Sequence, residues 1–201
     1  MKLFGLSGGI ASGKSTVQKM LEDLGCNIID ADHLYHQLLE PSAGEPSPLA
    51  MSINDIFPQS LGHDGSLDRV ALGNIVFQDP GARKKLEAIA HPAVALAFTE
   101  HVQKSRREGK NHCIYSVPLL YENKLESGFS AVIVVWVPEH IQKQRLAKRD
   151  NLSAQGIQER LAAQMSLDEK RQKADWVIDN SGSQEQTQSA VHQLWAQLGL
   201  K

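Results

Sequence analysis

A glycine-rich motif near the N-terminus constrains this chain more than any other feature. Residues 8–15 read GGIASGKS, which fits the phosphate-binding P-loop pattern G-x-x-x-x-G-K-[ST], with Gly8, Gly13, Lys14 and Ser15 at its fixed positions. Glycines at this spacing let several backbone N–H groups face phosphate oxygens, and the following helix adds its positive N-terminal end. Lys14 supplies a charge for the β- and γ-phosphates, and the Ser15 hydroxyl is placed to ligate Mg²⁺.

The residues on both sides of the motif are those that a P-loop needs. Residues 2–7 form an apolar run that reads as a buried strand, and residues 15–24 carry apolar positions at helical spacing. This order of strand, loop and helix makes a chance match in a glycine-rich turn the weaker interpretation. We therefore expect the loop to bind the phosphates of a nucleotide through Gly9, Ala11, Ser12, Gly13, Lys14, Ser15 and Thr16.

The bulk composition excludes several classes of protein. The chain has 201 residues, of which 41% are hydrophobic and 22% charged, values typical of a soluble globular protein. The net charge of −2 gives no basic field, so we do not expect nucleic acid as a partner. We see no signal peptide and no apolar stretch of transmembrane length, and we expect a cytosolic (cytoplasmic) protein without a membrane partner.

The two cysteines, Cys26 and Cys113, both lie beside apolar runs. Their spacing offers neither a disulfide framework nor a metal site. We expect both to be buried, reduced thiols.

Short apolar or β-branched runs alternate with helical patterns along the chain. This alternation predicts an α/β fold with a five-stranded parallel sheet covered by helices on both faces. Between the second and third strands we expect a helical insertion, including a long helix broken near His91-Pro92, and we expect Ser183 to cap the last helix with Gln186 as its capping-box partner. The strand signals after the first are at residues 27–30, 112–117, 131–137 and 176–178.

Asp30 and Asp32 lie two residues apart at the end of the second predicted strand. If the strand continues that far, both side chains lie on one side and face the edge where phosphates bind. One carboxylate could then accept a proton from an attacking hydroxyl, and the other could hold Mg²⁺ through water. Helix capping by Asp32 is the other interpretation, because Asp32 opens a helical segment, and the spacing leaves both open.

Arg145 and Arg149 are four residues apart in a helical segment and therefore share one face. Two guanidinium groups on one face suit a triphosphate, whose charge spreads over the equatorial oxygens during transfer. The alternative is a solvated basic face that includes Lys143 and Lys148, and the spacing by itself favours that alternative.

Three further polar positions have two interpretations each. His91 either belongs to a substrate site or caps a kink at Pro92. Arg69 either binds phosphate or forms a surface ion pair. Asn180 follows the last strand, where an adenine could be read, although an asparagine in a turn is the more common occurrence.

Taken together, these residues resemble the dephospho-CoA kinase family over nearly the whole chain. The P-loop is shared with many kinases, whereas the ordered set of motifs is far more specific. Ala11 stands where the family often has a third glycine, and alanine adopts a positive φ less readily, so we expect a working loop with an effect on affinity alone. The matching motifs are Gly8 to Thr16, Asp30-Ala-Asp32, Leu67-Asp-Arg69 with Leu72 and Ile75-Val-Phe77, His91-Pro92, Val117-Pro-Leu-Leu120 with Glu122, Arg145 with Arg149, Gln164, and Ala174-Asp175 with Asn180.

The resemblance implies phosphorylation of the ribose 3′-hydroxyl of dephospho-CoA, the last step of coenzyme A synthesis, with ATP and Mg²⁺. It implies a P-loop kinase core, a helical substrate-binding insertion and a small helical lid in a monomer or weak homo-oligomer. The implied core comprises residues 1–32, 111–139 and 174–201, the helical substrate domain residues 33–110, and the lid residues 140–173.

The resemblance also implies a role for each candidate residue. Asp32 becomes the general base on the 3′-hydroxyl, and Asp30 contacts the substrate or holds Mg²⁺ through water. The catalytic groups at the phosphates are Lys14 and the two lid residues Arg145 and Arg149. The remaining contacts are Arg69, His91 and Pro118 for the substrate and Asn180 for the nucleotide.

Two other classes of protein share part of these features. Another small-molecule or nucleoside-monophosphate kinase would share the P-loop and lid but lack the motifs around Arg69 and His91. A GTP-dependent switch protein needs D-x-x-G followed later by N-K-x-D. Asp179 to Gly182 fits the first pattern but lies near the C-terminus, and Asn123-Lys124 is followed by Glu126 where an aspartate is required. The sequence therefore disfavours a switch protein.

Overall fold

The computed structural model describes residues 1–58, 60–150 and 152–199. The chain divides into two compact units, which we call the sheet unit (residues 1–29 and 105–201) and the helical unit (residues 30–104). Each unit has its own hydrophobic core. The predicted division into core, substrate domain and lid stays a prediction.

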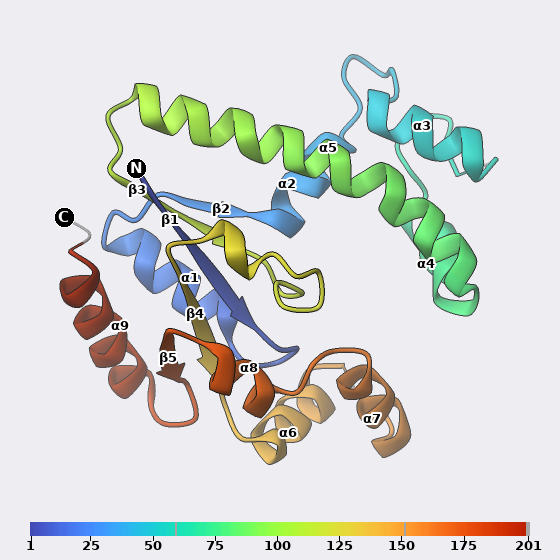
Figure 1. The fold of residues 1–201 in the computed structure, drawn as a ribbon. Helices are drawn as coiled ribbons and strands as arrows, with labels where there is room; N and C mark the ends of the chain where they lie inside the picture. The colour runs from blue at the N-terminus through green and yellow to red at the C-terminus, as the bar shows by residue number, and fades with distance from the viewer. Residues whose placement is uncertain (59, 151, 200–201) are drawn as a thin grey trace. The chain divides into compact units, whose positions relative to one another are not determined.

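The sheet unit is built on a five-stranded sheet with the strand order β2-β3-β1-β4-β5 (Figure 1). Strand β1 pairs in parallel with β3 and β4, and β4 pairs in parallel with β5. This arrangement confirms the predicted α/β fold and places β1 at the centre of the sheet. The strands are β1 (Lys2–Gly8), β2 (Ile28–Asp30), β3 (His112–Ser116), β4 (Ala131–Trp136) and β5 (Trp176–Asp179).

Helices α1 and α9 pack against each other beside the sheet and enclose its core (Figure 1). Leu6 of β1, Leu21 of α1 and Val191 of α9 are fully buried in this core. Burying each such side chain contributes about 1.5–3 kcal/mol, which fixes β1 and the loop that follows it. The helices of this unit are α1 (Lys14–Asp23), α6 (Glu139–Asp150), α7 (Ala154–Ala162), α8 (Leu167–Lys173) and α9 (Gln184–Leu198), with a 3₁₀ turn at Glu126–Gly128.

Capping boxes fix where two of these helices, α8 and α9, begin. The Ser183 hydroxyl accepts from Gln186 N, and the Gln186 amide accepts from Ser183 N, which confirms the predicted capping box of α9. A second box, formed by Ser166 and Glu169, begins α8. Each box satisfies backbone N–H groups in the first turn of its helix.

The helical unit contains α2 (Ala31–Leu38), α3 (Pro48–Ile56), α4 (Arg69–Gln78) and most of α5 (Pro80–Arg107). The predicted break near His91-Pro92 is wrong, because α5 continues for 28 residues with Pro92 inside it. Proline removes one helical hydrogen bond, but Leu86, Ile89 and Ala93 on both sides of Pro92 pack against the helical core. Tertiary packing therefore holds the helix through a residue that locally disfavours it.

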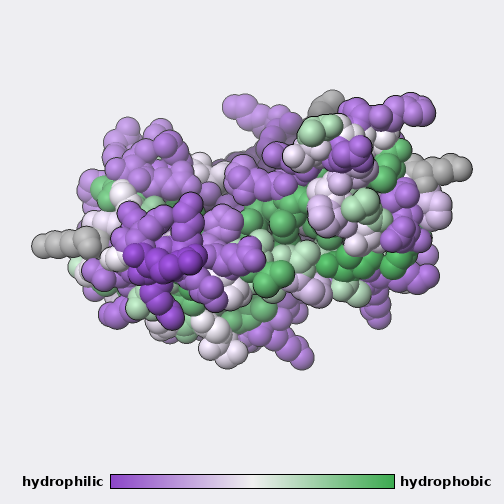
Figure 2. Space-filling view, turned by 90° about the horizontal axis from the view of Figure 1, so that it is seen from above, coloured by the Kyte–Doolittle hydropathy of each residue, from purple (hydrophilic) through white to green (hydrophobic). Residues whose placement is uncertain are grey.

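Apolar side chains are also exposed on the helical unit, and Phe77 on α4 is 84% exposed. Hydrophobic surface is visible among the hydrophilic side chains in Figure 2. Among the described residues, however, no helix is both long and apolar enough to cross a membrane.

Candidate active site

The P-loop connects β1 to α1 through two left-handed residues. Ser12 N donates to Gly9 O at 3.1 Å, and Val17 N donates to Gly13 O at 3.2 Å. Gly13 has a φ of +86° and Ala11 a φ of +58°. Glycine adopts such angles without strain, whereas an L-residue costs about 1 kcal/mol or more. The alanine that departs from the family pattern therefore occupies a strained position.

The start of α1 fits a bound phosphate group. Gly13 is the N-cap of α1 and provides no side-chain cap, and the first turn carries no acidic residue. The helix N-terminus thus presents N–H groups and a positive dipole end without a competing carboxylate. A Cβ on Gly13 would lie 2.0 Å from Asn180 Nδ2, so the turn requires glycine. These features match the triphosphate that the motif predicts.

Lys14 lies at the carboxyl edge of the sheet. Its ammonium group donates to the Ser116 hydroxyl at the end of β3. Ser15 and Thr16 are exposed at the start of α1. Among the described residues no cluster of three His, Cys, Asp or Glu side chains could hold a metal ion. The Ser15 hydroxyl is an oxygen ligand of the kind that Mg²⁺ prefers, and the predicted Mg²⁺ site stays a prediction.

Asn180 forms a hydrogen bond with the backbone of the P-loop. It is only 8% exposed, its Nδ2 donates to Ser12 O at 2.8 Å, and its Oδ1 accepts from Thr187 Oγ1 at 2.8 Å. Both ends of the amide therefore contact protein groups, and one of them fixes the loop backbone. The predicted contact of Asn180 with the nucleotide stays a prediction.

The two arginines of α6 have different partners. Arg145 donates to Asn180 O at 2.8 Å, to Ser12 O at 3.3 Å and to Ala11 O at 3.4 Å, so it lies against the P-loop. Arg149 instead forms two hydrogen bonds with Asp150, at 2.6 and 2.9 Å, and Arg160 joins the same carboxylate. The Arg149 hydrogen bond and the two arginine charges lower the pKa of Asp150.

Comparison with known proteins decides the family. The profile of the dephospho-CoA kinase family matches residues 2–186. The chain is 47% identical to a dephospho-CoA kinase from Symbiobacterium thermophilum over 97% of its own length and 80% of the relative's. It is 44% identical to one from Anaeromyxobacter dehalogenans, with 98% and 92% covered.

The chain belongs to the dephospho-CoA kinase family.

Solved structures agree with this dephospho-CoA kinase assignment. A protein from Thermus thermophilus superimposes with a TM-score of 0.82 and 32% identity, covering 98% of this chain and 97% of that one. The dephospho-CoA kinase from Campylobacter jejuni superimposes with a TM-score of 0.73 and 29% identity, covering 98% and 96%. A shikimate kinase from Acinetobacter baumannii, at 16% identity and a TM-score of 0.50, shares the fold alone.

The aspartate pair of this dephospho-CoA kinase family member lies at a strand-to-helix junction. Strand β2 ends at Asp30 and α2 begins at Ala31, so the strand does not continue to Asp32 and the period-two argument does not apply. Asp30 is the N-cap of α2, because its Oδ1 accepts from His33 N at 3.0 Å. The capping role predicted for Asp32 is therefore wrong, and Asp32 lies exposed in the first turn.

The other predicted substrate residues are spread over both units. On the helical unit, Arg69 begins α4 and contacts the His36 ring, and His91 lies exposed on α5. In the sheet unit, the Pro118 carbonyl accepts from Ser7 Oγ at 3.1 Å and from Lys170 Nζ at 2.7 Å. Arg69 thus has a histidine partner where a surface ion pair was the alternative, and its phosphate contact stays a prediction.

Sequence reasoning missed a buried lysine of α8. Lys170 is 0% exposed, and its ammonium group lies 3.0 Å from Glu122 Oε1, 2.7 Å from Pro118 O and 3.2 Å from Gly8 O. Burial lowers the pKa of Lys170, and the Glu122 carboxylate opposes that shift. The surrounding sequence is so polar that it reads as a solvated helix. The one signal in the sequence was Glu122, the partner of Lys170, which belongs to a family motif.

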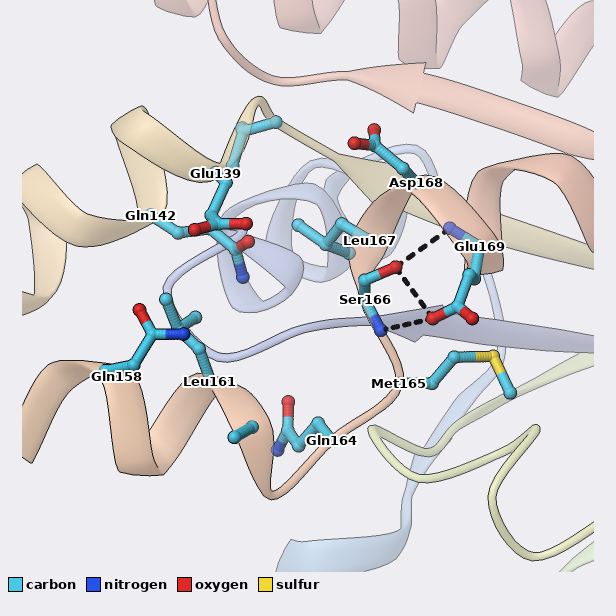
Figure 3. Close-up of a pocket in the computed structure, with 12 residues that line it drawn as sticks. Glu139, Gln142, Gln158, Leu161, Gln164, Met165, Ser166, Leu167, Asp168 and Glu169 are labelled. Carbon is cyan, nitrogen blue, oxygen red and sulfur yellow. Dashed lines mark hydrogen bonds between the residues drawn. The ribbon is translucent and has the colours of Figure 1, made fainter.

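A cavity of about 240 Å³ opens among α6, α7 and α8 (Figure 3). Its lining mixes polar and apolar side chains, and the polar ones include glutamines from α6, from α7 and from the segment after α7. Figure 3 shows the Ser166–Glu169 capping box on its edge. The lining includes Glu139, Gln142, Gln158, Gln164, Ser166 and Glu169.

Proposed function

We propose that this member of the dephospho-CoA kinase family transfers the γ-phosphoryl group of ATP to the ribose 3′-hydroxyl of dephospho-CoA, giving coenzyme A and ADP. This reaction is the last step of coenzyme A synthesis, and we expect it in the cytosol. The observation that carries the proposal is the P-loop at the start of α1, with Lys14 at the sheet edge, in a chain that matches this family over residues 2–186.

The P-loop supplies binding and charge neutralisation, which make up most of the catalysis of phosphoryl transfer. Lys14 would neutralise charge on the β- and γ-phosphates, while the N–H groups at the start of α1 bind phosphate oxygens. The Ser15 hydroxyl would ligate Mg²⁺, which when bound would offset the negative charge of the phosphates. Arg145 already lies against the loop carbonyls, at the position from which a guanidinium group could turn to a phosphate.

Asp32 is the proposed general base. It would accept the proton of the 3′-hydroxyl as the bond to phosphorus forms. Asp30 caps α2 through His33 N, and this bond would hold the first turn that carries Asp32. Arg69 and His91 are proposed to contact the dephospho-CoA substrate.

An ADP-release assay tests the proposal. Purified protein is incubated with ATP, Mg²⁺ and either dephospho-CoA, shikimate or a nucleoside monophosphate, with the Lys14→Ala variant as the control for contaminating kinases. ADP release should depend on dephospho-CoA, and phosphorus NMR of the product should place the new phosphate on the 3′ oxygen. Release that follows a different acceptor, or that equals the Lys14→Ala control, would refute the proposed function.

A further inference from the structure

Two glutamines bind the two backbone polar groups of Ile10 in the P-loop. Gln142 on α6 donates through Nε2 to Ile10 O at 2.8 Å, and Gln164, after α7, accepts through Oε1 from Ile10 N at 2.9 Å. Gln142 is only 5% exposed. Both side chains are shown among the residues of Figure 3. Together they satisfy both hydrogen-bonding groups of Ile10.

The backbone fixes which end of each amide faces Ile10. A carbonyl oxygen can only accept and an N–H can only donate. Gln142 must therefore present its NH₂ group, and Gln164 must present its oxygen. The two glutamines, although chemically identical, have opposite roles at Ile10.

Ile10 lies directly before the strained turn of the loop. Ala11 follows Ile10 with a φ of +58°, a conformation that persists only when the surroundings hold it. The loop also packs closely at its start, because a Cβ on Gly9 would lie 2.9 Å from Gln142 Nε2 and 3.1 Å from Leu167 Cγ. The contacts of Ile10, together with the Arg145 hydrogen bond to Ala11 O at 3.4 Å, can thus hold Ala11 in its left-handed conformation.

We propose that Gln142 and Gln164 are positioning residues of the nucleotide site, and that they keep the P-loop in its phosphate-binding conformation by holding the backbone N–H and C=O of Ile10. The inference rests on the proposed function where KM is measured in the reaction. Its test by MgADP binding does not depend on that function. Both glutamines act through the loop backbone and neither contacts the nucleotide. Their loss raises KM for ATP and leaves KM for dephospho-CoA within about twofold, because a loosened loop binds phosphate less often.

The substitution of glutamate for glutamine tests this inference at both positions, because it removes a hydrogen-bond donor but keeps an acceptor. Gln142→Glu replaces the donor with a carboxylate that faces a carbonyl oxygen, and KM for ATP should rise about tenfold or more, since both groups lose their buried hydrogen bond. Gln164→Glu keeps an oxygen acceptor for Ile10 N, and KM should stay within about threefold. Gln158→Glu, a matched control on the same cavity with an exposed side chain, should match wild type.

Further variants and measurements separate positioning from a general loss of structure. Gln142→Met removes the donor without adding charge and serves if Gln142→Glu does not fold. It should weaken MgADP binding in calorimetry about tenfold. Lowering the pH should partly restore Gln142→Glu but not Gln142→Met, because a protonated carboxyl can donate to Ile10 O.

Equal effects of the two glutamate substitutions would overturn the proposal. So would a lowered Tm with an unchanged affinity for MgADP, because that result assigns the glutamines to folding alone. Calorimetry needs no acceptor, so it tests the positioning role even if dephospho-CoA proves not to be the substrate. Failure of the proposed function would appear instead as a wild-type protein that binds MgADP but does not phosphorylate dephospho-CoA.

Discussion

The candidate residues of the sheet unit and those of the helical unit are held in different ways. Around the P-loop, Lys14, Arg145 and Asn180 are half-buried or buried, and each contacts a group of a neighbouring element. On the helical unit, Asp32 and His91 are exposed side chains on helix surfaces. The nucleotide side is thus preorganised by its own fold, whereas the acceptor side presents groups on a solvent-facing surface.

This contrast predicts which property each substitution changes. Residues that support the P-loop serve both folding and nucleotide binding, so their replacement should affect stability and KM for ATP together. Exposed residues of the helical unit contribute little to stability, so their replacement should affect the reaction alone.

Lys170→Met should cause the largest loss of stability. Removing one partner of a buried ion pair leaves the Glu122 carboxylate without its cation, at a cost of about 3–5 kcal/mol. Chemical denaturation of the variant measures this loss. The double variant Lys170→Met with Glu122→Gln should recover part of it, because no charge is then left unpaired. A single variant as stable as wild type would show that the Lys170–Glu122 contact does not hold α8 to the sheet.

Lys14→Ala should lower kcat/KM by about 10²-fold or more, as expected for loss of a preorganised charge at a transferring phosphoryl group. The fold should survive, because Lys14 is half-exposed at the start of α1. Steady-state kinetics with circular dichroism checks both statements. Activity within a few-fold of wild type would contradict the P-loop assignment.

Asp32→Asn should lower kcat by about 10²-fold with nearly unchanged ATP binding, because an amide cannot accept the proton. Asp30→Asn is the matched control, since asparagine is as good an N-cap as aspartate and the bond to His33 N can be kept. The two variants distinguish a general base from a helix cap. If kcat falls only in the Asp30 variant, Asp30 and not Asp32 is the general base.

Arg149→Lys should lower kcat/KM several-fold, because lysine cannot make the planar two-pronged contact that a guanidinium group makes with phosphate. In the structure Arg149 contacts Asp150, so this prediction requires the side chain to change partner when nucleotide binds. Lys148→Arg is the control on the same helix. If both variants match wild type in steady-state kinetics, Arg149 belongs to a solvated ion pair, whose contribution is typically small.

Ala11→Gly should have the smallest effect and in the opposite direction. Glycine relieves the strain at a φ of +58°, although it also gives the unfolded chain more freedom. We expect a net gain of up to about 1 kcal/mol in the free energy of unfolding and a modestly lower KM for ATP. A variant that binds MgADP more weakly would show that the alanine methyl group packs favourably in the loop.

The parts that the sequence predicts correctly depend on local patterns. The strand, loop and helix around Gly13 lie within 25 residues, and the Ser183–Gln186 box lies within four, so spacing alone specifies them. The continuous helix through Pro92 was not predictable in this way, because packing against the helical core overrides the local preference of proline. The strand signal at residues 27–30 ends where β2 ends, but α2 begins at Ala31 directly after it, so Asp30 and not Asp32 is the cap.

The contacts that support the P-loop could not be predicted from the sequence for a different reason. Gln142 and Gln164 lie 132 and 154 residues from Ile10, and Lys170 lies 162 residues from Gly8. Each belongs to a polar segment that reads as a solvent-exposed helix. Only the three-dimensional fold shows that their polar ends are directed inward at backbone groups, a long-range arrangement that no spacing in one sequence encodes.

The two buried thiols also determine how the protein behaves as a chemical reagent. Burial raises the pKa of Cys26 and of Cys113 to about 12, and no other cysteine is present in the sequence. At neutral pH roughly one thiol in 10⁵ is then ionised. Alkylating agents and peroxide, which react with the thiolate, should therefore react very slowly with the folded chain. Above pH 9.0 the unfolded chain releases these protons and the folded chain keeps them, so stability falls as the pH rises toward 12. A thiol-specific dye added at pH 8 should therefore label chiefly molecules that have opened, and its rate follows the population of open molecules when reclosing is faster than labelling.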